Sequence, residues 1–173
     1  MDTHHRLIQA LTDPSVYAHP TTEITVLQTH ISWIVLTGPY AYKIKKPVNF
    51  GFVDFSTLAK RHFFCQEELR LNRRLAPHLY LDVVPIAGTP EQPELDTQGS
   101  PIEYAVKMVQ FAQDTLLSHL IHVGQLQAAH IDHLAHAVSA FHTRIATADA
   151  TSRFGTPEVV SQAVQENFRV SPQ

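Results

Sequence analysis

A short segment of the sequence places lysines where they could hold a negatively charged group. Lys43, Lys45 and Lys46 lie in the stretch Tyr40 to Val48, whose other residues are typical of a β-strand. Side chains alternate between the two faces of a strand, so Lys43 and Lys45 share one face with Ala41. Two ammonium groups on one face can bind a carboxylate or a phosphate. The spacing therefore predicts an anion-binding strand.

The next predicted helix supplies a carboxylate at a matching position. Ser56 is expected to cap this helix, which continues to about Leu75. Four of its residues have spacings that place them on one stripe: Phe64, Glu68, Leu71 and Leu75. A carboxylate within an apolar stripe needs a cationic partner, because burying an unpaired charge is strongly unfavourable. We expect Lys43 to be the partner of Glu68, with Glu67 as the alternative carboxylate.

An Ala-x-Lys pattern on a third strand, followed by a glutamate on the next helix, is the arrangement that protein kinases use. In kinases the lysine holds the α- and β-phosphates of ATP, and the glutamate positions the lysine. In this sequence Ala41 would leave space for an adenine ring, Lys43 would hold phosphates and Glu68 would orient Lys43. A simpler interpretation stays open, because lysines on an edge strand can guard against aggregation and helical glutamates are often solvated.

Periodicity and turn residues predict a sheet followed by helices. The expected elements are a helix at 3–12, strands at 23–29, 31–36 and 40–48, a helix at 56–75, strands at 79–86 and 102–109, and helices at 115–122, 128–145 and 157–170. The stretch 87–100, with its prolines and glycines, is interpreted as a loop. The class is α+β, with a five-stranded antiparallel lobe and one long helix. We expect a lead-in at 1–20, this lobe at 21–111 and an incomplete helical lobe at 112–173.

The composition is typical of a globular domain. The 173 residues are 44% hydrophobic with a net charge of −3, which argues against disorder and against nucleic-acid or membrane binding through bulk charge. Eight of the 13 basic residues nevertheless fall between Lys43 and Arg74, which favours a local phosphate site. Cys65 is the single cysteine, and no apolar run approaches the roughly 20 residues that crossing a bilayer requires. We expect a cytoplasmic protein without a membrane or nucleic-acid partner.

Three segments carry a resemblance to a known family: THISWIVLTGPYAYKIKKPVNFGFVDFSTL, CQEELRLNRRLAPHLYLDVVPI and IEYAVKMVQF. They resemble the N-terminal part of bacterial aminoglycoside phosphotransferase-like proteins, over about residues 5 to 170. Proteins of this group often carry a P-loop ATP-binding domain behind the phosphotransferase-like part. The resemblance implies a protein-kinase-like fold, binding of ATP with Mg²⁺, phosphoryl transfer to a small molecule, and a fused or separate P-loop partner.

The resemblance also implies which residues bind the nucleotide. Lys43 resembles the phosphate-binding lysine, Glu68 its helical partner and Ala41 the residue beside adenine. The segment Met108 to Phe111 resembles the hinge whose backbone meets the base, which adds three residues: Val109, Gln110 and Phe111.

The catalytic part of the family pattern is not found in these 173 residues. There is no His-Gly-Asp segment, and His130-Ile131-Asp132 lacks the expected asparagine because position 137 is alanine. Asp54-Phe55-Ser56 imitates a metal-binding Asp-Phe-Gly but precedes the long helix, so we interpret it as a turn. No catalytic residue is therefore assigned, and the Mg²⁺ ligands are expected outside this chain.

Other functions have weaker support in the sequence. Twelve histidines invite a metal site, but His130, His133 and His136 spread around a helix, and no zinc pattern is complete. The basic residues of the long helix surround it instead of lining one face, which argues against nucleic acid. The main alternative is a non-catalytic interaction or regulatory module built on the same lobe.

Overall fold

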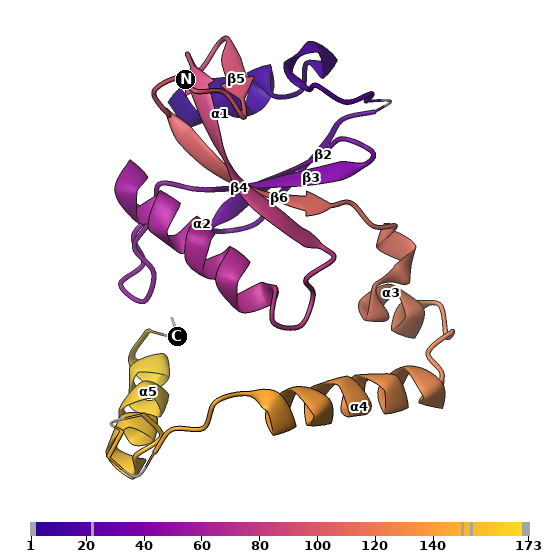
Figure 1. Ribbon diagram of the computed structural model, residues 1–173, viewed down its shortest axis with the longest axis vertical. Helices are drawn as coiled ribbons and strands as arrows, with labels where there is room; N and C mark the ends of the chain where they lie inside the picture. The colour runs from indigo at the N-terminus through magenta and orange to yellow at the C-terminus, as the bar shows by residue number, and fades with distance from the viewer. Residues whose placement is uncertain (1–2, 22, 150, 153, 171–173) are drawn as a thin grey trace. The chain divides into compact units, whose positions relative to one another are not determined.

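Figure 1 shows the computed structural model, which describes residues 3–21, 23–149, 151–152 and 154–170. The chain divides into two compact units, residues 1–126 and 127–173. The sheet and the first helices belong to the first unit, and two further helices belong to the second. The predicted junction at Ala112 falls inside the first unit. The start of the predicted lead-in, residues 1–2, lies outside the described residues.

The described residues of the first unit form a six-stranded antiparallel sheet with the order β1-β2-β3-β6-β4-β5. Its strands are β1 (Thr25–Gln28), β2 (Ser32–Leu36), β3 (Tyr40–Lys45), β4 (Tyr80–Gly88), β5 (Pro93–Leu95) and β6 (Glu103–Val109). β3 lies between β2 and β6, so it is an interior strand. Its lysines therefore do not guard an exposed sheet edge.

The predicted five-stranded, protein-kinase-like lobe is wrong, because the sheet has a sixth strand. β5 pairs with the end of β4, inside the stretch 87–100 that the sequence pattern assigns to a loop. Gly88 permits the return of the chain, since its φ is 79° and a Cβ there would collide with the carbonyl oxygen of Gln92. Pro93 is tolerated because β5 is an edge strand. The mixed α+β class holds, but three residues beginning with proline show no alternation from which a strand could be predicted.

The described helices are α1 (Thr3–Ala10), α2 (Leu58–Asn72), α3 (Leu117–His122), α4 (Ala128–Arg144) and α5 (Pro157–Val170). α2 begins later than expected, because Thr57 is its N-cap and accepts a hydrogen bond from the amide of Lys60 at 3.2 Å. Just before it, Asp54 accepts hydrogen bonds from the amide and the hydroxyl of Ser56 at 3.0 and 2.6 Å. The segment Asp54-Phe55-Ser56 is thus confirmed as a turn that leads into the helix.

The two faces of the sheet have different partners. On one face, Leu7 and Ile8 of α1 join a buried apolar core that contains Ile44 of β3 and Ala105 of β6. On the other face, α2 packs against β4 and β6 (Figure 1). The alternation along β6 is visible in the side chains, because Ala105 belongs to the core while its neighbour Tyr104 stacks on His62 of α2 at 3.9 Å.

The buried face of α2 differs from the predicted stripe. Three residues of the helix are buried: Arg61, Cys65 and Leu69. Leu71 and Leu75 are instead 45% and 58% exposed, so the stripe from Phe64 to Leu75 is wrong as a buried face. The error arises because a charged residue, Arg61, lies at the centre of the buried face. A search for apolar residues at helical spacing does not include an arginine. Glu68 lies beside this face and still turns toward the sheet.

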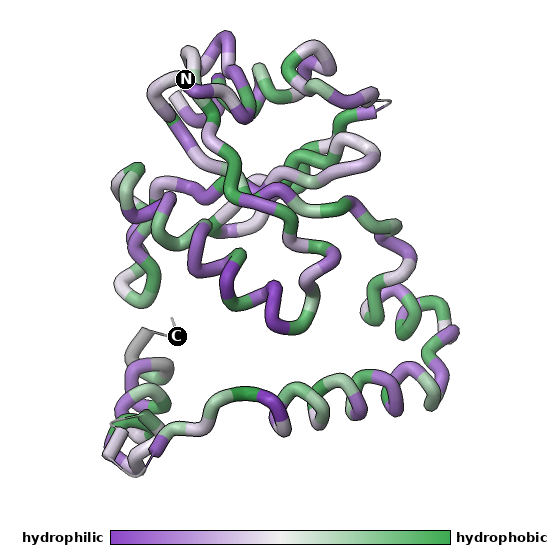
Figure 2. Tube along the Cα trace, in the orientation of Figure 1, coloured by the Kyte–Doolittle hydropathy of each residue, from purple (hydrophilic) through white to green (hydrophobic). Residues whose placement is uncertain are grey.

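The second unit contains α4 and α5, and both expose apolar residues. Ile131, Leu134 and Val138 recur along α4 at helical spacing, and each is between 39% and 50% exposed. Figure 2 shows hydrophobic and hydrophilic residues alternating along this helix. In the described part of the chain, no helix combines the length and apolar content that spanning a membrane requires.

Candidate functional site

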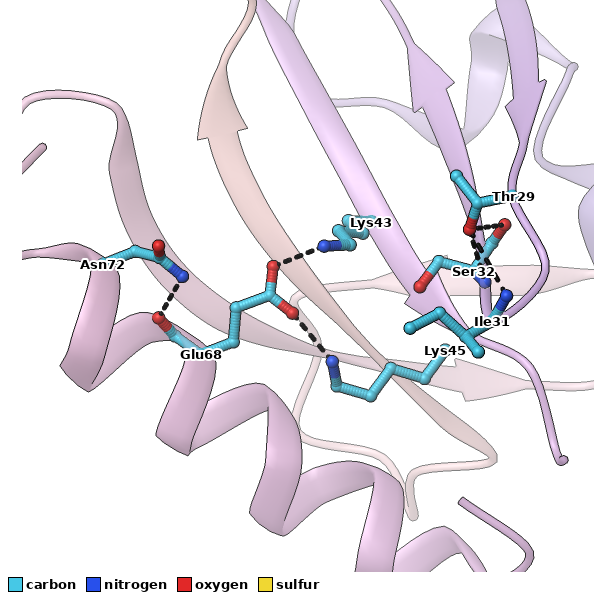
Figure 3. A network of polar contacts seen from close by, with 7 residues as sticks. All are labelled: Thr29, Ile31, Ser32, Lys43, Lys45, Glu68 and Asn72. Atoms are coloured by element: carbon cyan, nitrogen blue, oxygen red, sulfur yellow. Dashed lines mark hydrogen bonds and ion pairs between the residues drawn. The ribbon is translucent and has the colours of Figure 1, made fainter. Parts of the chain in front are cut away.

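Glu68 of α2 lies between two lysines of β3 (Figure 3). Lys43 Nζ donates a hydrogen bond to Glu68 Oε1 at 2.7 Å, and Lys45 Nζ donates one to Glu68 Oε2 at 2.7 Å. The predicted contact between Lys43 and Glu68 is therefore confirmed, whereas the role of Lys45 was not predicted. The alternative carboxylate, Glu67, pairs with Arg70 on the same helix instead.

The pleat of β3 explains why both lysines reach one carboxylate. Lys43 and Lys45 are two residues apart and point to the face that α2 covers, while Ile44 points into the apolar core. A further bond steadies the helix at this point, because Asn72 Nδ2 donates to the backbone oxygen of Glu68 at 2.9 Å. The site is thus built from an interior strand and a capped helix, which hold it more firmly than loops would.

The charges and burial around the site shift the pKa values of three groups. Burial alone would raise the pKa of Glu68, but Lys43 and Lys45 outweigh it and hold this pKa below its ordinary value. Burial also raises the pKa of the Tyr80 hydroxyl, with a further contribution from the Glu68 charge. One turn before Glu68, burial raises the pKa of the Cys65 thiol to about 12, so Cys65 stays a neutral, unreactive residue of the interior.

A cavity of about 370 Å³ opens on the same face of the sheet, and we call it the sheet pocket. Its apolar lining includes side chains from four strands: Leu27, Ile34, Leu36, Ala41 and Met108. The register explains their meeting, because Leu36, Ala41 and Met108 lie opposite one another across β2, β3 and β6. Lys43 also lines the pocket. It belongs to the lysine–carboxylate cluster of Lys43, Lys45 and Glu68, so one positive charge of that cluster borders the pocket. The pocket therefore joins an apolar surface to a cationic group.

The predicted hinge forms one wall of the sheet pocket. Val109, Gln110 and Phe111 all line it, so five of the six predicted site residues border one cavity, and Glu68 reaches it through Lys43. Two of the hinge amides already donate hydrogen bonds within the protein. Val109 donates to the Leu79 carbonyl oxygen at 2.9 Å, and Gln110 donates to the Pro39 carbonyl oxygen at 3.1 Å. The Phe111 amide has no protein acceptor among the described residues. A ligand could receive a backbone hydrogen bond there without breaking an existing one.

A second cluster of buried charges, which the sequence pattern does not predict, lies between α1, α2 and β6. Glu103 of β6 is fully buried and accepts hydrogen bonds from Arg61 Nε at 2.7 Å and from His4 Nε2 at 3.0 Å. Arg61 also donates to the Phe55 carbonyl oxygen at 3.0 Å. This cluster ties α1, α2 and β6 together. The available signal was Glu103 itself, which lies on the same side of β6 as the core residue Ala105 and so required a cation.

Two histidines of α4 make local contacts within the helix. His130 Nδ1 accepts a hydrogen bond from the Gln127 amide at 3.1 Å and so helps to cap the helix. His136 lies close to the Asp132 carbonyl oxygen, at 2.8 Å. Within the described ranges, no group of three or more histidine, cysteine or acidic residues is arranged to hold a metal ion.

The chain is similar to proteins of mycobacteria. It is 30% identical over 159 residues to uncharacterized protein Rv2004c of Mycobacterium tuberculosis and to uncharacterized protein Mb2027c of Mycobacterium bovis. The match covers 90% of this chain but 30% of each relative, so the chain spans less than a third of their length. No protein-family model matches the chain, and no solved structure matches it.

Proposed function

We propose that the chain binds a nucleotide, with ATP as the preferred ligand, in the sheet pocket. The observation that carries the proposal is the Lys43–Glu68 pair at the border of an apolar cavity of about 370 Å³. A purine ring requires a flat apolar surface, and a triphosphate requires cations that other groups hold in place. The two requirements meet in this one cavity.

Each predicted residue has a part in the proposal. Ala41 packs beside the base because its small side chain leaves space, and Lys43 binds the phosphates. Glu68 orients Lys43 through the 2.7 Å contact. The base lies along Val109, Gln110 and Phe111, and its hydrogen bond comes from the Phe111 amide, since the other two amides are engaged.

Phosphoryl transfer to a small molecule is the activity that we propose for the whole protein. The step requires Mg²⁺ ligands and a group that accepts the proton of the attacking hydroxyl. The described residues offer no cluster suited to the metal, so no step of the reaction is assigned to this chain. Its proposed share is to bind ATP, in a cytoplasmic protein and in company with a P-loop ATP-binding domain, fused or separate.

Calorimetric titration with ATP tests the binding proposal. We expect Lys43→Met to weaken ATP binding at least about tenfold, because a hydrogen bond to a charged group contributes about 1.5–3 kcal/mol. The matched control is Lys46→Met, which removes the same charge from a lysine that lies over Trp33 and outside the sheet pocket. Absence of heat with the wild-type chain, or equal loss in the two variants, would refute the proposal.

One observation favours a second function, that of an interaction or regulatory module. The apolar residues of α4 border a shallow hollow and remain exposed. Exposed apolar surface of this kind can mark a protein-binding site. The two functions separate in the ATP titration, because an interaction module that only keeps the lobe as a scaffold needs no nucleotide.

A further inference from the structure

Lys43 and Lys45 contact the same carboxylate but have different surroundings. Lys43 borders the sheet pocket with a side chain that is 27% exposed, whereas the Lys45 side chain is 6% exposed and is absent from the described pocket lining. Lys45 Nζ also lies 4.8 Å from the centre of the Phe55 ring, and Phe55 is itself buried. Lys45 is thus confined by two partners, while Lys43 is open to a ligand.

The geometry points to Lys45 as a positioning residue that holds Glu68 in place while Lys43 turns to a bound phosphate. This inference rests on the proposed nucleotide function and adds a second lysine with a separate task. Lys45 acts through Glu68 and does not touch the ligand.

The two oxygens of Glu68 make this division of tasks possible. Oε1 bonds to Lys43 and Oε2 to Lys45, so one bond can break while the other remains. A single lysine that moved to a phosphate would leave Glu68 without a cation, which is unfavourable for a largely buried carboxylate. With Lys45 in place, Glu68 keeps a partner and Lys43 is free to exchange its acceptor.

The charges of the cluster also favour an anion. Two ammonium groups face one carboxylate, so the three side chains together carry one excess positive charge. That excess is shielded from water on the side of Lys45 and exposed on the side of Lys43. The attraction is therefore directed to the lysine that borders the pocket.

A double-mutant cycle on ATP binding tests the inference. Calorimetry would compare Lys43→Met, Lys45→Met and the double variant, each with ATP and with adenosine, which lacks phosphates. We expect Lys45→Met to weaken ATP binding about fivefold, to leave adenosine binding unchanged and to have no further effect once Lys43 is removed. Additive losses would make Lys45 a direct phosphate ligand and overturn the inference. An unchanged ratio of ATP to adenosine affinity would make its role purely structural and overturn it as well.

A second measurement needs no substitution and covers the case in which Lys45→Met fails to fold. In the wild-type chain with ¹⁵N-labelled lysine, ATP should shift the Nζ resonance of Lys43 and leave that of Lys45 nearly unchanged. Equal shifts of the two resonances would contradict the separate tasks.

Titration of the Glu68 carboxyl by NMR separates failure of this inference from failure of the nucleotide proposal. Without any ligand, removing Lys45 from the Lys43→Met variant should raise the pKa of Glu68 further, because it removes the last lysine bonded to this carboxylate. If the wild-type chain bound no ATP, the nucleotide proposal would fail, and this comparison would still show whether Lys45 holds Glu68. An equal pKa of Glu68 in Lys43→Met and in the double variant would overturn the positioning role of Lys45.

Discussion

Glu68 illustrates how the pKa of one partly buried side chain can depend on the charge of its neighbours. Its pKa lies below the ordinary value of 4.5, because Lys43 and Lys45 outweigh the effect of burial. A carboxylate whose pKa is lower in the folded than in the unfolded chain stabilises the fold fully above its unfolded pKa. That contribution is lost as the pH falls through the folded pKa, since protonation removes the partner of both ammonium groups.

We therefore expect Glu68→Gln to change the acid sensitivity of the fold. The free energy of unfolding of the wild type should fall more steeply below about pH 4.5 than that of the variant, whose amide does not titrate. Urea unfolding at a series of pH values, followed by the fluorescence of the single tryptophan, Trp33, measures both slopes. Parallel curves would mean that the two lysines do not lower the pKa of Glu68.

Two buried hydroxyls, one in β2 and one directly after it, allow a matched comparison. Ser32 and Thr37 are both fully buried, but Ser32 Oγ has no hydrogen-bond partner among the described residues, whereas Thr37 Oγ1 donates to the Tyr40 carbonyl oxygen at 2.8 Å. Ser32→Ala should be neutral or stabilise the fold by up to about 1 kcal/mol, because it removes an unpaired polar group. Thr37→Val should destabilise it by about 1–2 kcal/mol, because it leaves a carbonyl without that donor. Urea unfolding of both variants would test the contrast, and equal losses would contradict it.

At the scale of elements, ion pairs help to attach α2 to the sheet. Arg61 is buried and pairs with the buried Glu103 of β6, while Glu68 of the same helix bonds to β3. Arg61→Met should destabilise the fold by about 3–5 kcal/mol, because it leaves the carboxylate of Glu103 without its arginine. Arg70→Met is the control on the same helix, and it should have little effect because its pair with Glu67 is exposed. Thermal unfolding compares them, and similar melting temperatures would refute the claim.

The elements also show what a sequence can predict here. Strands β2, β3 and β6 and helices α4 and α5 follow from their periodicity, and the Lys43–Glu68 contact follows from strand alternation and the need to pair a carboxylate. β5 could not be predicted, because its pairing depends on a turn at Gly88 and not on a pattern of its own. The buried face of α2 could not be predicted from apolar spacing, because Arg61 at its centre is a charged residue. In the fold, Arg61 is buried because it pairs with Glu103. The contact between Lys45 and Glu68 was not predicted, because pairing each carboxylate with one cation assigns Glu68 to Lys43 alone.

At the scale of the whole molecule, the second unit carries an apolar surface on α4. Ile131, Leu134 and Val138 share one side of this helix and border its hollow. Leu134→Lys should reduce the fluorescence of a hydrophobic dye such as ANS with the full chain. Ala129→Lys is the control, because at 100° per residue Ala129 lies on the opposite side of α4. Equal dye fluorescence in the two variants would show that this surface does not bind apolar molecules.

The interior position of β3 has a consequence for how the chain finds its fold. A shift of one residue in the pairing of β3 would exchange its two faces, so that Lys43 and Lys45 would point into the apolar core beside α1. Tyr42 and Ile44 would meanwhile emerge on the side of Glu68. An intermediate with this wrong pairing would bury two ammonium groups away from Glu68. Because burying an unpaired charge is unfavourable, we expect it to be short-lived. We therefore expect Lys43 and Lys45 to disfavour a wrong pairing of β3 while the sheet forms, in addition to their proposed tasks at the sheet pocket.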